Sequence, residues 1–162
     1  MDKNSTITVN DNITLITMHN IPLDMGFICE IFSNIASMGV NIDVISMSPS
    51  QKVLTSLSFT VQDDEFSKVL EYTSKLRKKS SNITSIVSSG NCKITICDSR
   101  MEDSPGFAAK VFKAVSEAMA DVRIITTSID EIALLITKAD CEKTVEKIKS
   151  VIKFAAVILN TK

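Results

Sequence analysis

Along the first half of the chain, the spacing of hydrophobic positions changes between the period of a helix and the period of a strand. Apolar residues recur at helical spacing from Gly26 to Gly39, a glycine of the kind that ends helices. A second helical pattern follows Asp63 and Asp64, either of which could cap it. Four segments have the composition or the alternation typical of strands: residues 13–18, 42–47, 54–61 and 83–87. The predicted order is strand–helix–strand–strand–helix–strand.

The second half repeats this order. Gly26 aligns with Gly106 and Ser48 with Ser128, and the apolar positions between them agree without a gap. Such a match indicates a duplicated unit. The repeated elements are strands at 93–97, 122–127 and 132–137, a helix at 107–119, and a last helix from about Asp140 that buries Val145, Ile148, Val151 and Ile152.

Each unit has the order of the ferredoxin-like βαββαβ fold, an α+β arrangement with two helices on one face of an antiparallel sheet. The second unit lacks a clear last strand after Phe154, whereas residues 5–9 read as a strand without a place in the first unit. We therefore expect the N-terminal strand to complete the second sheet, with Ala155–Leu159 as the alternative. The expected domains are 11–88, and 5–10 together with 91–162. We expect four phenylalanines in the cores: Phe27, Phe32, Phe107 and Phe112.

Composition and charge exclude several classes of protein. The chain is 44% hydrophobic and 23% charged, with a net charge of −1, which favours neither nucleic acid nor an anionic membrane. No apolar run reaches the roughly 18–20 residues of a membrane span, and the polar start lacks the order of a signal peptide. We therefore expect a cytoplasmic protein.

Residues for catalysis or for a cofactor are scarce. The four cysteines (Cys29, Cys92, Cys97 and Cys141) form no C-x-x-C pair, and His19 is the one histidine, so we expect reduced thiols and no metal site. A Ser–His or Cys–His arrangement would have to be built on His19. The four glycines are scattered, whereas a phosphate-binding loop needs them clustered. We therefore expect no catalytic residues and no cofactor.

The glycines that open two predicted helices suggest a binding site. Gly26 would expose the N–H groups of Phe27 and Ile28, and Gly106 those of Phe107 and Ala108, at the positive end of a helix dipole. These groups can bind a carboxylate, and Asp43 could accept an ammonium group. Together they would form a receptor for a zwitterion. The alternative is that Gly26 serves a tight turn and Asp43 is a solvated edge residue.

Specific motifs in both halves resemble the tandem ACT domains of aspartokinases. The first half carries Ile13–Met18, then Gly26-Phe27-x-x-x-Ile31-Phe32, then Asn41–Ser46. The second half carries Met101–Phe112, with a complete Asp103-x-Pro105-Gly106 turn, followed by Ile124–Ser128. The resemblance covers roughly residues 5–155. It implies intertwined units, in which the first strand joins the second ACT unit. A kinase domain precedes these repeats in an aspartokinase, and here four residues precede Ser5.

The resemblance also implies an amino-acid effector. In the family it binds between the strand–helix turn of one ACT unit and the Asn-Ile-Asp strand of another, usually at a dimer interface. The first site would comprise Met25, Gly26, Phe27, Ile28, Asn41, Ile42 and Asp43. A possible second site would comprise Asp103, Pro105, Gly106, Phe107, Ala108, Asp121 and Val122. The first turn lacks the proline, as in lysine-responsive relatives, so we expect lysine first and threonine next. Met47, Asp121 and Arg123 depart from the family pattern or from the repeat.

The sequence thus predicts a non-catalytic regulatory protein for feedback control in the biosynthesis of aspartate-family amino acids. It would be an aspartokinase regulatory subunit or a stand-alone relative, with the excised tail of a full aspartate kinase as an alternative. Its expected partners are a second copy, in a homodimer, and an aspartokinase catalytic chain. The rival interpretation is a ligand-free dimerisation module.

Overall fold

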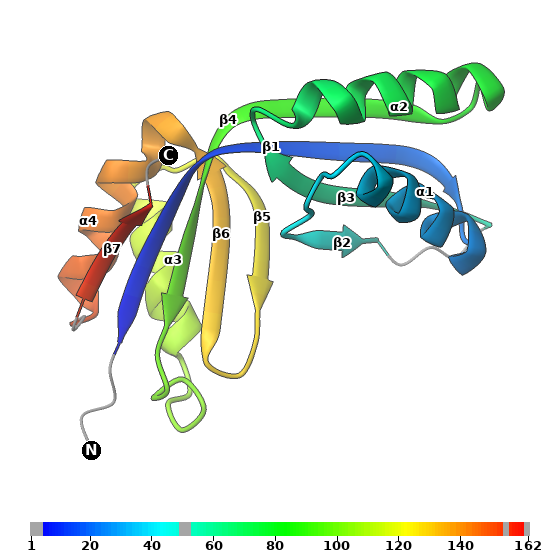
Figure 1. The fold of residues 1–162 in the computed structure, drawn as a ribbon. Helices are drawn as coiled ribbons and strands as arrows, with labels where there is room; N and C mark the ends of the chain where they lie inside the picture. Colours follow the sequence, from blue (N-terminus) through cyan, green and yellow to red (C-terminus); the bar gives the residue numbers. More distant parts are fainter. Residues whose placement is uncertain (1–4, 49–52, 154–155, 161–162) are drawn as a thin grey trace. The chain divides into compact units, whose positions relative to one another are not determined.

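The computed structural model describes residues 5–48, 53–153 and 156–160. The chain divides into two compact units. The N-terminal unit comprises Ile13–Ser89, and the C-terminal unit comprises the residues up to Asn12 together with those from Gly90 onward. Each unit combines a sheet with two α-helices, which confirms the predicted α+β, ferredoxin-like fold (Figure 1). Among the described residues, no helix is long and apolar enough to cross a membrane.

The described residues of the N-terminal unit form four strand segments and two helices. Its elements are the second half of β1 (Thr6–Pro22), α1 (Met25–Ser37), β2 (Ile45–Met47), β3 (Leu54–Gln62), α2 (Phe66–Lys79) and the first half of β4 (Thr84–Cys97). The strand order is β2-β3-β1-β4, and β3 runs antiparallel to both neighbours. One core joins Ile31 of α1 and Val69 of α2 to Phe59 of β3, so both helices cover one face of the sheet.

The C-terminal unit repeats the arrangement and adds one strand. It contains the other halves of β1 and β4, then α3 (Phe107–Glu117), β5 (Val122–Thr127), β6 (Glu131–Thr137), a short 3₁₀ turn (Lys138–Asp140), α4 (Cys141–Val151) and β7 (Ala156–Asn160). The strand order is β7-β1-β4-β6-β5. Its core joins Val111 of α3 and Ile148 of α4 to Ile94 of β4.

Two segments considered for the last strand of the second unit both lie in its sheet. Thr6–Asn10 at the start of β1 pairs in parallel with Ala156–Asn160, which is β7 (Figure 1). The N-terminal residues Ile7 and Val9 are buried in the core of this unit.

Strands β1 and β4 are longer than expected. The sequence predicted separate strands at 5–9 and 13–18, and at 83–87 and 93–97, but each pair is one continuous strand. Asn12 and Gly90 have left-handed φ values of 60° and 68° inside these strands. Such residues usually mark turns. Here each stands where its strand passes from one unit into the other.

Several local predictions are wrong. Residues 42–44 lie outside β2, which is confined to Ile45–Met47. Neither Asp63 nor Asp64 caps α2, because the helix begins after Glu65 and Asp63 instead accepts a hydrogen bond from Thr14. Phe112 and Val151 are 37% and 44% exposed, although both were expected in the core.

Candidate effector sites

The turn that opens α1 is closed by an aspartate. Asp24 has an extended backbone, and its carboxylate accepts hydrogen bonds from the N–H groups of Gly26 (3.2 Å) and Phe27 (3.0 Å). The N–H of Ile28 donates to the Asp24 carbonyl at 3.1 Å. The expectation of free N–H groups on Phe27 and Ile28 is therefore wrong. The displaced aspartate of this turn acts as an ordinary helix N-cap.

The rim of this turn is apolar and exposed. Met25 is 69% exposed, and Leu23 donates its N–H to the carbonyl of Val53 at 2.7 Å, which brings two further exposed apolar residues together. The side chain of Ile28, by contrast, is buried in the core and can offer a ligand only its backbone. The turn therefore presents an apolar surface with the Asp24 carboxylate within it.

The other half of the first predicted site lies at the far end of the same unit. The N–H groups of Asp43 and Val44 donate to Thr60, to its carbonyl (3.2 Å) and its hydroxyl (3.0 Å). Thr60 pairs with Leu15, whereas the Gly26 turn follows Pro22 at the opposite end of β1. From Leu15 to Pro22 a strand rises about 23 Å. Within one unit, Asn41–Asp43 and Met25–Ile28 therefore do not form one site.

The turn that opens α3 differs from the first turn. Gly106 has a left-handed φ of 89° and precedes α3 without any side-chain cap. The Phe107 N–H donates to the Ser104 carbonyl at 3.1 Å, so it too is occupied. Asp103 is exposed and does not serve as the cap. In place of the carboxylate that closes the first turn, the second turn has a left-handed glycine.

The two halves of the second predicted site are also far apart. The Asp121 carbonyl accepts the N–H of Thr137, which pairs with Asn91, whereas the turn follows Cys97 at the other end of that stretch of β4. From Asn91 to Cys97 a strand rises about 20 Å. The Asp121 carboxylate forms an ion pair with Arg123 at 2.7 Å. The departure at Arg123 thus neutralises the acidic group of this site.

The N–H of Asp121 also holds a carboxylate in place. It donates to Asp140 at 3.0 Å, and Thr137 and Lys143 donate to the same side chain. These hydrogen bonds, led by that of Asp121, hold the pKa of Asp140 below its usual range. Asp140 therefore stays ionised and fixes the start of α4 beside β5.

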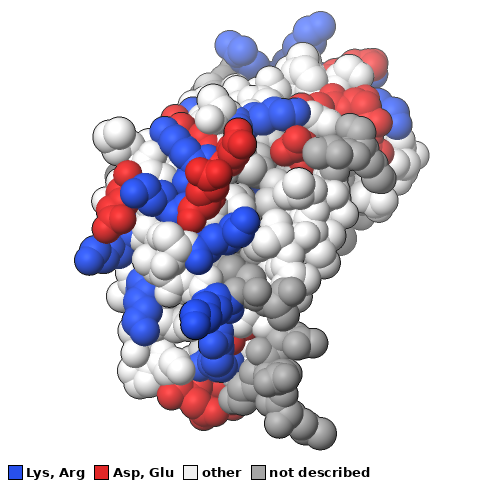
Figure 2. Space-filling view, turned by 90° about the vertical axis from the view of Figure 1, so that its left-hand side faces the viewer, with Lys and Arg blue, Asp and Glu red and all other residues white. Residues whose placement is uncertain are grey.

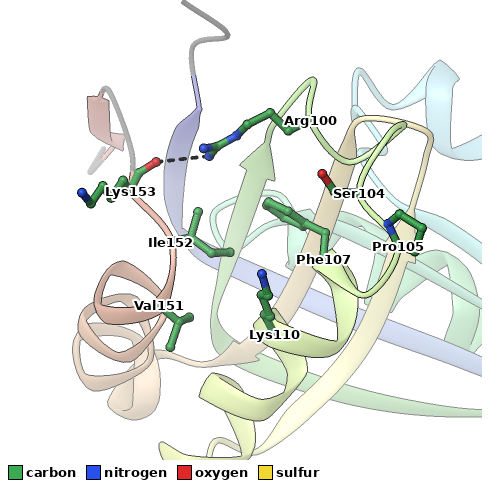
Figure 3. A pocket seen from close by; sticks show the side chains of 8 residues that line it. All are labelled: Arg100, Ser104, Pro105, Phe107, Lys110, Val151, Ile152 and Lys153. Carbon is green, nitrogen blue, oxygen red and sulfur yellow. Dashed lines mark hydrogen bonds between the residues drawn. The ribbon is translucent and has the colours of Figure 1, made fainter.

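A pocket of about 280 Å³ lies beside the second turn (Figure 3). It includes Pro105 and Phe107 of the predicted site, but not the other five residues: Asp103, Gly106, Ala108, Asp121 and Val122. The described residues that line it are Arg100, Ser104, Pro105, Phe107, Lys110, Val151, Ile152 and Lys153. Three of these residues are cationic, so the pocket suits an anionic group such as a carboxylate.

Arg100 at this pocket is anchored by a buried carboxylate. Its guanidinium donates to both oxygens of Asp98, and one nitrogen also reaches the carbonyl of Lys153 at 3.4 Å (Figure 3). Ser5 donates its hydroxyl to the same carboxylate. The Arg100 hydrogen bonds, followed by that of Ser5, lower the pKa of Asp98 to about 2. The cation therefore has a fixed position at the pocket edge.

Sequence reasoning missed one cluster of ligand-type side chains. Asp11, Cys92 and Cys141 lie together in the C-terminal unit, and their ligand atoms are all within 4.8 Å of one another. The hydrogen bond with Cys141, followed by burial, raises the pKa of the Cys92 thiol. The cysteines are 49 positions apart, so no short spacing motif could reveal them. Only the pairing of β1 with β4 and the packing of α4 bring the three together.

The face that carries α4 offers little to a polyanion. Figure 2 shows Lys and Arg interspersed with Asp and Glu over the face that carries α4, a helix whose sequence alternates acidic and basic residues. This mixture agrees with the balanced net charge and forms no continuous basic surface in that view.

Comparisons with known proteins point to one family. Residues 94–151 match the ACT domain family. The aspartokinase of Bacillus sp. (strain MGA3) is 26% identical over 144 residues, which cover 86% of this chain and 34% of the relative. The chain thus spans about a third of the length of that curated relative.

Solved structures share the fold. The regulatory subunit of aspartate kinase from Thermus thermophilus, in its ligand-free form, has a TM-score of 0.81 at 21% identity, and the match covers 94% of this chain and 100% of that one. Aspartokinase III of E. coli in complex with lysine and aspartate has a TM-score of 0.67 at 22% identity, over 89% of this chain and 32% of that one. Residues 94–151 thus resemble an ACT domain, and the matches over most of the chain are to aspartokinases and to a regulatory subunit of aspartate kinase that shares the fold.

Proposed function

We propose that this chain binds a free amino acid, lysine before threonine, and thereby exerts feedback control on an aspartate kinase. It would act as a regulatory subunit or as a stand-alone relative in the biosynthesis of aspartate-family amino acids. The observation that carries this proposal is the division of the first candidate site. Its turn and Asp43 lie at opposite ends of one unit, as expected if each pairs with the complementary half of another copy.

The proposed site joins Met25–Ile28 of one copy to Asn41–Asp43 of another. Asp43 is exposed and would accept the ammonium group of the ligand. The ligand carboxylate would compete with Asp24 for the N–H groups of Gly26 and Phe27. The apolar rim at Met25 would cover the aliphatic stem of lysine. The second site, at Asp103–Ala108 and Asp121–Val122, is a weaker candidate because Arg123 already pairs with Asp121.

A homodimer follows from this arrangement and has support in the sheet edges. Strand β2 is an edge strand of the N-terminal unit, and its Ile45 and Met47 are 53% and 42% exposed. Strand β5 is an edge strand of the C-terminal unit, and its Ile125 is 49% exposed. Exposed apolar edges are templates for pairing with another chain.

Two of the similar structures support the choice of ligand and partner. The Thermus chain is a regulatory subunit of aspartate kinase, and the E. coli enzyme was solved with lysine. An aspartokinase catalytic chain is therefore the proposed partner, and the expected location is the cytoplasm.

Calorimetry with lysine, threonine, methionine and the branched-chain amino acids tests the proposal. We expect lysine to bind, and Asp43→Asn to weaken its binding by at least about tenfold, because a charge-assisted hydrogen bond contributes about 1.5–3 kcal/mol. Asp64→Asn is the matched control, because Asp64 is exposed and lies outside the site. Binding that is equally strong in both variants would exclude Asp43 from the site.

The second candidate function is a ligand-free dimerisation module, which the exposed apolar edge of β2 also favours. A stable dimer that binds none of these amino acids would establish this alternative and refute the receptor.

A further inference from the structure

Three side chains from three separate elements converge in the C-terminal unit. Asp11 comes from β1, Cys92 from β4 and Cys141 from the first residue of α4. The two sulfur atoms are 2.6 Å apart, and the carboxylate lies within 4.8 Å of both. Cys92 is fully buried, whereas Cys141 is partly exposed. The cluster therefore lies at the edge of the core with one side toward solvent.

The chemistry of these ligands selects a class of ion. Thiolate sulfur favours soft or borderline cations, and two thiolates with one carboxylate match the three-ligand zinc sites that keep a fourth position open. A pocket of about 420 Å³ borders the cluster and is lined by Asp11 and Cys141. It could supply the water for that fourth position.

The charges around the cluster balance when a divalent ion is present. Two thiolates and one carboxylate carry three negative charges, and a divalent cation leaves one of them uncompensated. Lys138 forms an ion pair with Asp11 Oδ2 at 3.3 Å and supplies the remaining positive charge. Since a carboxylate has two oxygens, Asp11 can bind an ion through one and keep Lys138 on the other, a typical outer-shell arrangement.

We propose that Asp11, Cys92 and Cys141 bind one soft divalent cation of the zinc class. Sulfur ligands of a tetrahedral zinc ion, at Zn–S distances of about 2.3 Å, lie about 3.8 Å apart, so the two thiols must separate when the ion enters. Cys141 can move because it is partly exposed and begins a helix. Binding releases the thiol protons to solvent. This site is independent of the proposed amino-acid receptor.

A disulfide between the two cysteines is the competing use of this cluster. Disulfide formation joins the two sulfur atoms alone and gives Asp11 no role. A cation is instead attracted by the same carboxylate. Asp11 is therefore the observation that favours metal binding over oxidation.

Titration of the reduced, metal-free full chain with Co²⁺ tests the site, because thiolate ligands give a sulfur-to-cobalt charge-transfer band. We expect one Co²⁺ per chain, displaced by Zn²⁺. Cys92→Ser and Cys141→Ser should each weaken binding at least about tenfold. Asp11→Asn should weaken it while keeping the band. The double variant Cys29→Ser/Cys97→Ser is the matched control and should bind like the original chain, because both of its cysteines lie outside the cluster.

Three results would overturn the proposal. One is the absence of the band when all four thiols are reduced. Another is a charge-transfer band that Cys141→Ser leaves unchanged. Because this variant keeps the buried Cys92, it tests the site even if Cys92→Ser unfolds. The third is a Cys92–Cys141 disulfide, identified by peptide mass spectrometry after exposure to air, in a chain that binds no Co²⁺ when reduced.

Discussion

At the scale of single residues, the buried carboxylate of Asp98 ties the beginning of the chain to the end of β4. Its side chain is fully buried and accepts hydrogen bonds from Ser5, from the Arg100 backbone (2.9 Å) and from the Arg100 guanidinium. No buried side-chain nitrogen or oxygen in the described part of the chain lacks a partner. Loss of the Asp98 charge would leave these donors without their acceptor.

We expect Asp98→Asn to lower the free energy of unfolding by about 2 kcal/mol at pH 7, the contribution of a charge-assisted hydrogen bond. The folded pKa of about 2 lies below the unfolded value of about 3.9, so the contribution is complete above about pH 4 and is lost as pH falls toward 2. Urea unfolding at several pH values measures this. Asp64→Asn is the exposed control, and a difference from the original chain that stays constant down to pH 2 would contradict the assignment.

At the scale of elements, the two helix-opening glycines play different roles. Gly106 has a left-handed φ, and a Cβ there would meet no atom within 4 Å. Glycine is therefore needed at this position for its backbone conformation and not for lack of space. Gly26 lies within the first turn of α1 without a left-handed φ, and a Cβ would approach Asp24 Oδ2 to 3.3 Å. The two turns are thus aligned in sequence but not equivalent in structure.

Alanine substitution should separate the two glycines. Gly106→Ala should cost about 1–2 kcal/mol of unfolding free energy, because a left-handed conformation is strained for any residue with a Cβ. Gly26→Ala should stay within about 0.5 kcal/mol, since alanine favours a helix and the Asp24 side chain can shift. Chemical denaturation of both variants measures the contrast. A larger loss for Gly26→Ala would show that the first turn has no room for a methyl group.

The elements themselves could be predicted largely from sequence, because apolar periodicity records which face each one buries. The helix around Ile31 and the alternating strand around Phe59 are examples. The continuity of β1 and β4 could not be predicted, because Asn12 and Gly90 have the local signature of turns. The separation of Gly26 from Asp43 agrees with what the family resemblance implies, in which the turn and the Asn-Ile-Asp strand of one site come from different units. The Asp24 cap was missed because capping and ligand binding use the same N–H groups.

At the scale of the whole molecule, the proposed dimer and the proposed binding site depend on each other. If the two halves of the site come from two copies, a variant that cannot dimerise also cannot bind the ligand. If the whole site lay within one chain, ligand binding would not depend on dimerisation.

We therefore expect Ile45→Lys to abolish both dimerisation and lysine binding while leaving the fold intact, because a lysine on an exposed edge strand blocks pairing. Sedimentation should shift from a dimer to the 17.7 kDa monomer. Ile129→Lys is the control, because Ile129 is exposed and lies outside β2. Ser56→Lys would not serve, because Ser56 lies on β3 inside the sheet. A monomeric variant that still binds lysine would refute the shared site.

The crossing of β1 and β4 between the units also has a consequence during synthesis on the ribosome. Residues 13–89 form a continuous segment, so the N-terminal unit can fold as soon as that segment has emerged. The C-terminal unit takes its Thr6–Asn10 strand from the chain before that segment and its Ala156–Asn160 strand from the chain after it. Ile7 and Val9 must therefore stay without their core until the later segment that contains Ile94, Val111 and Ile148 has also emerged.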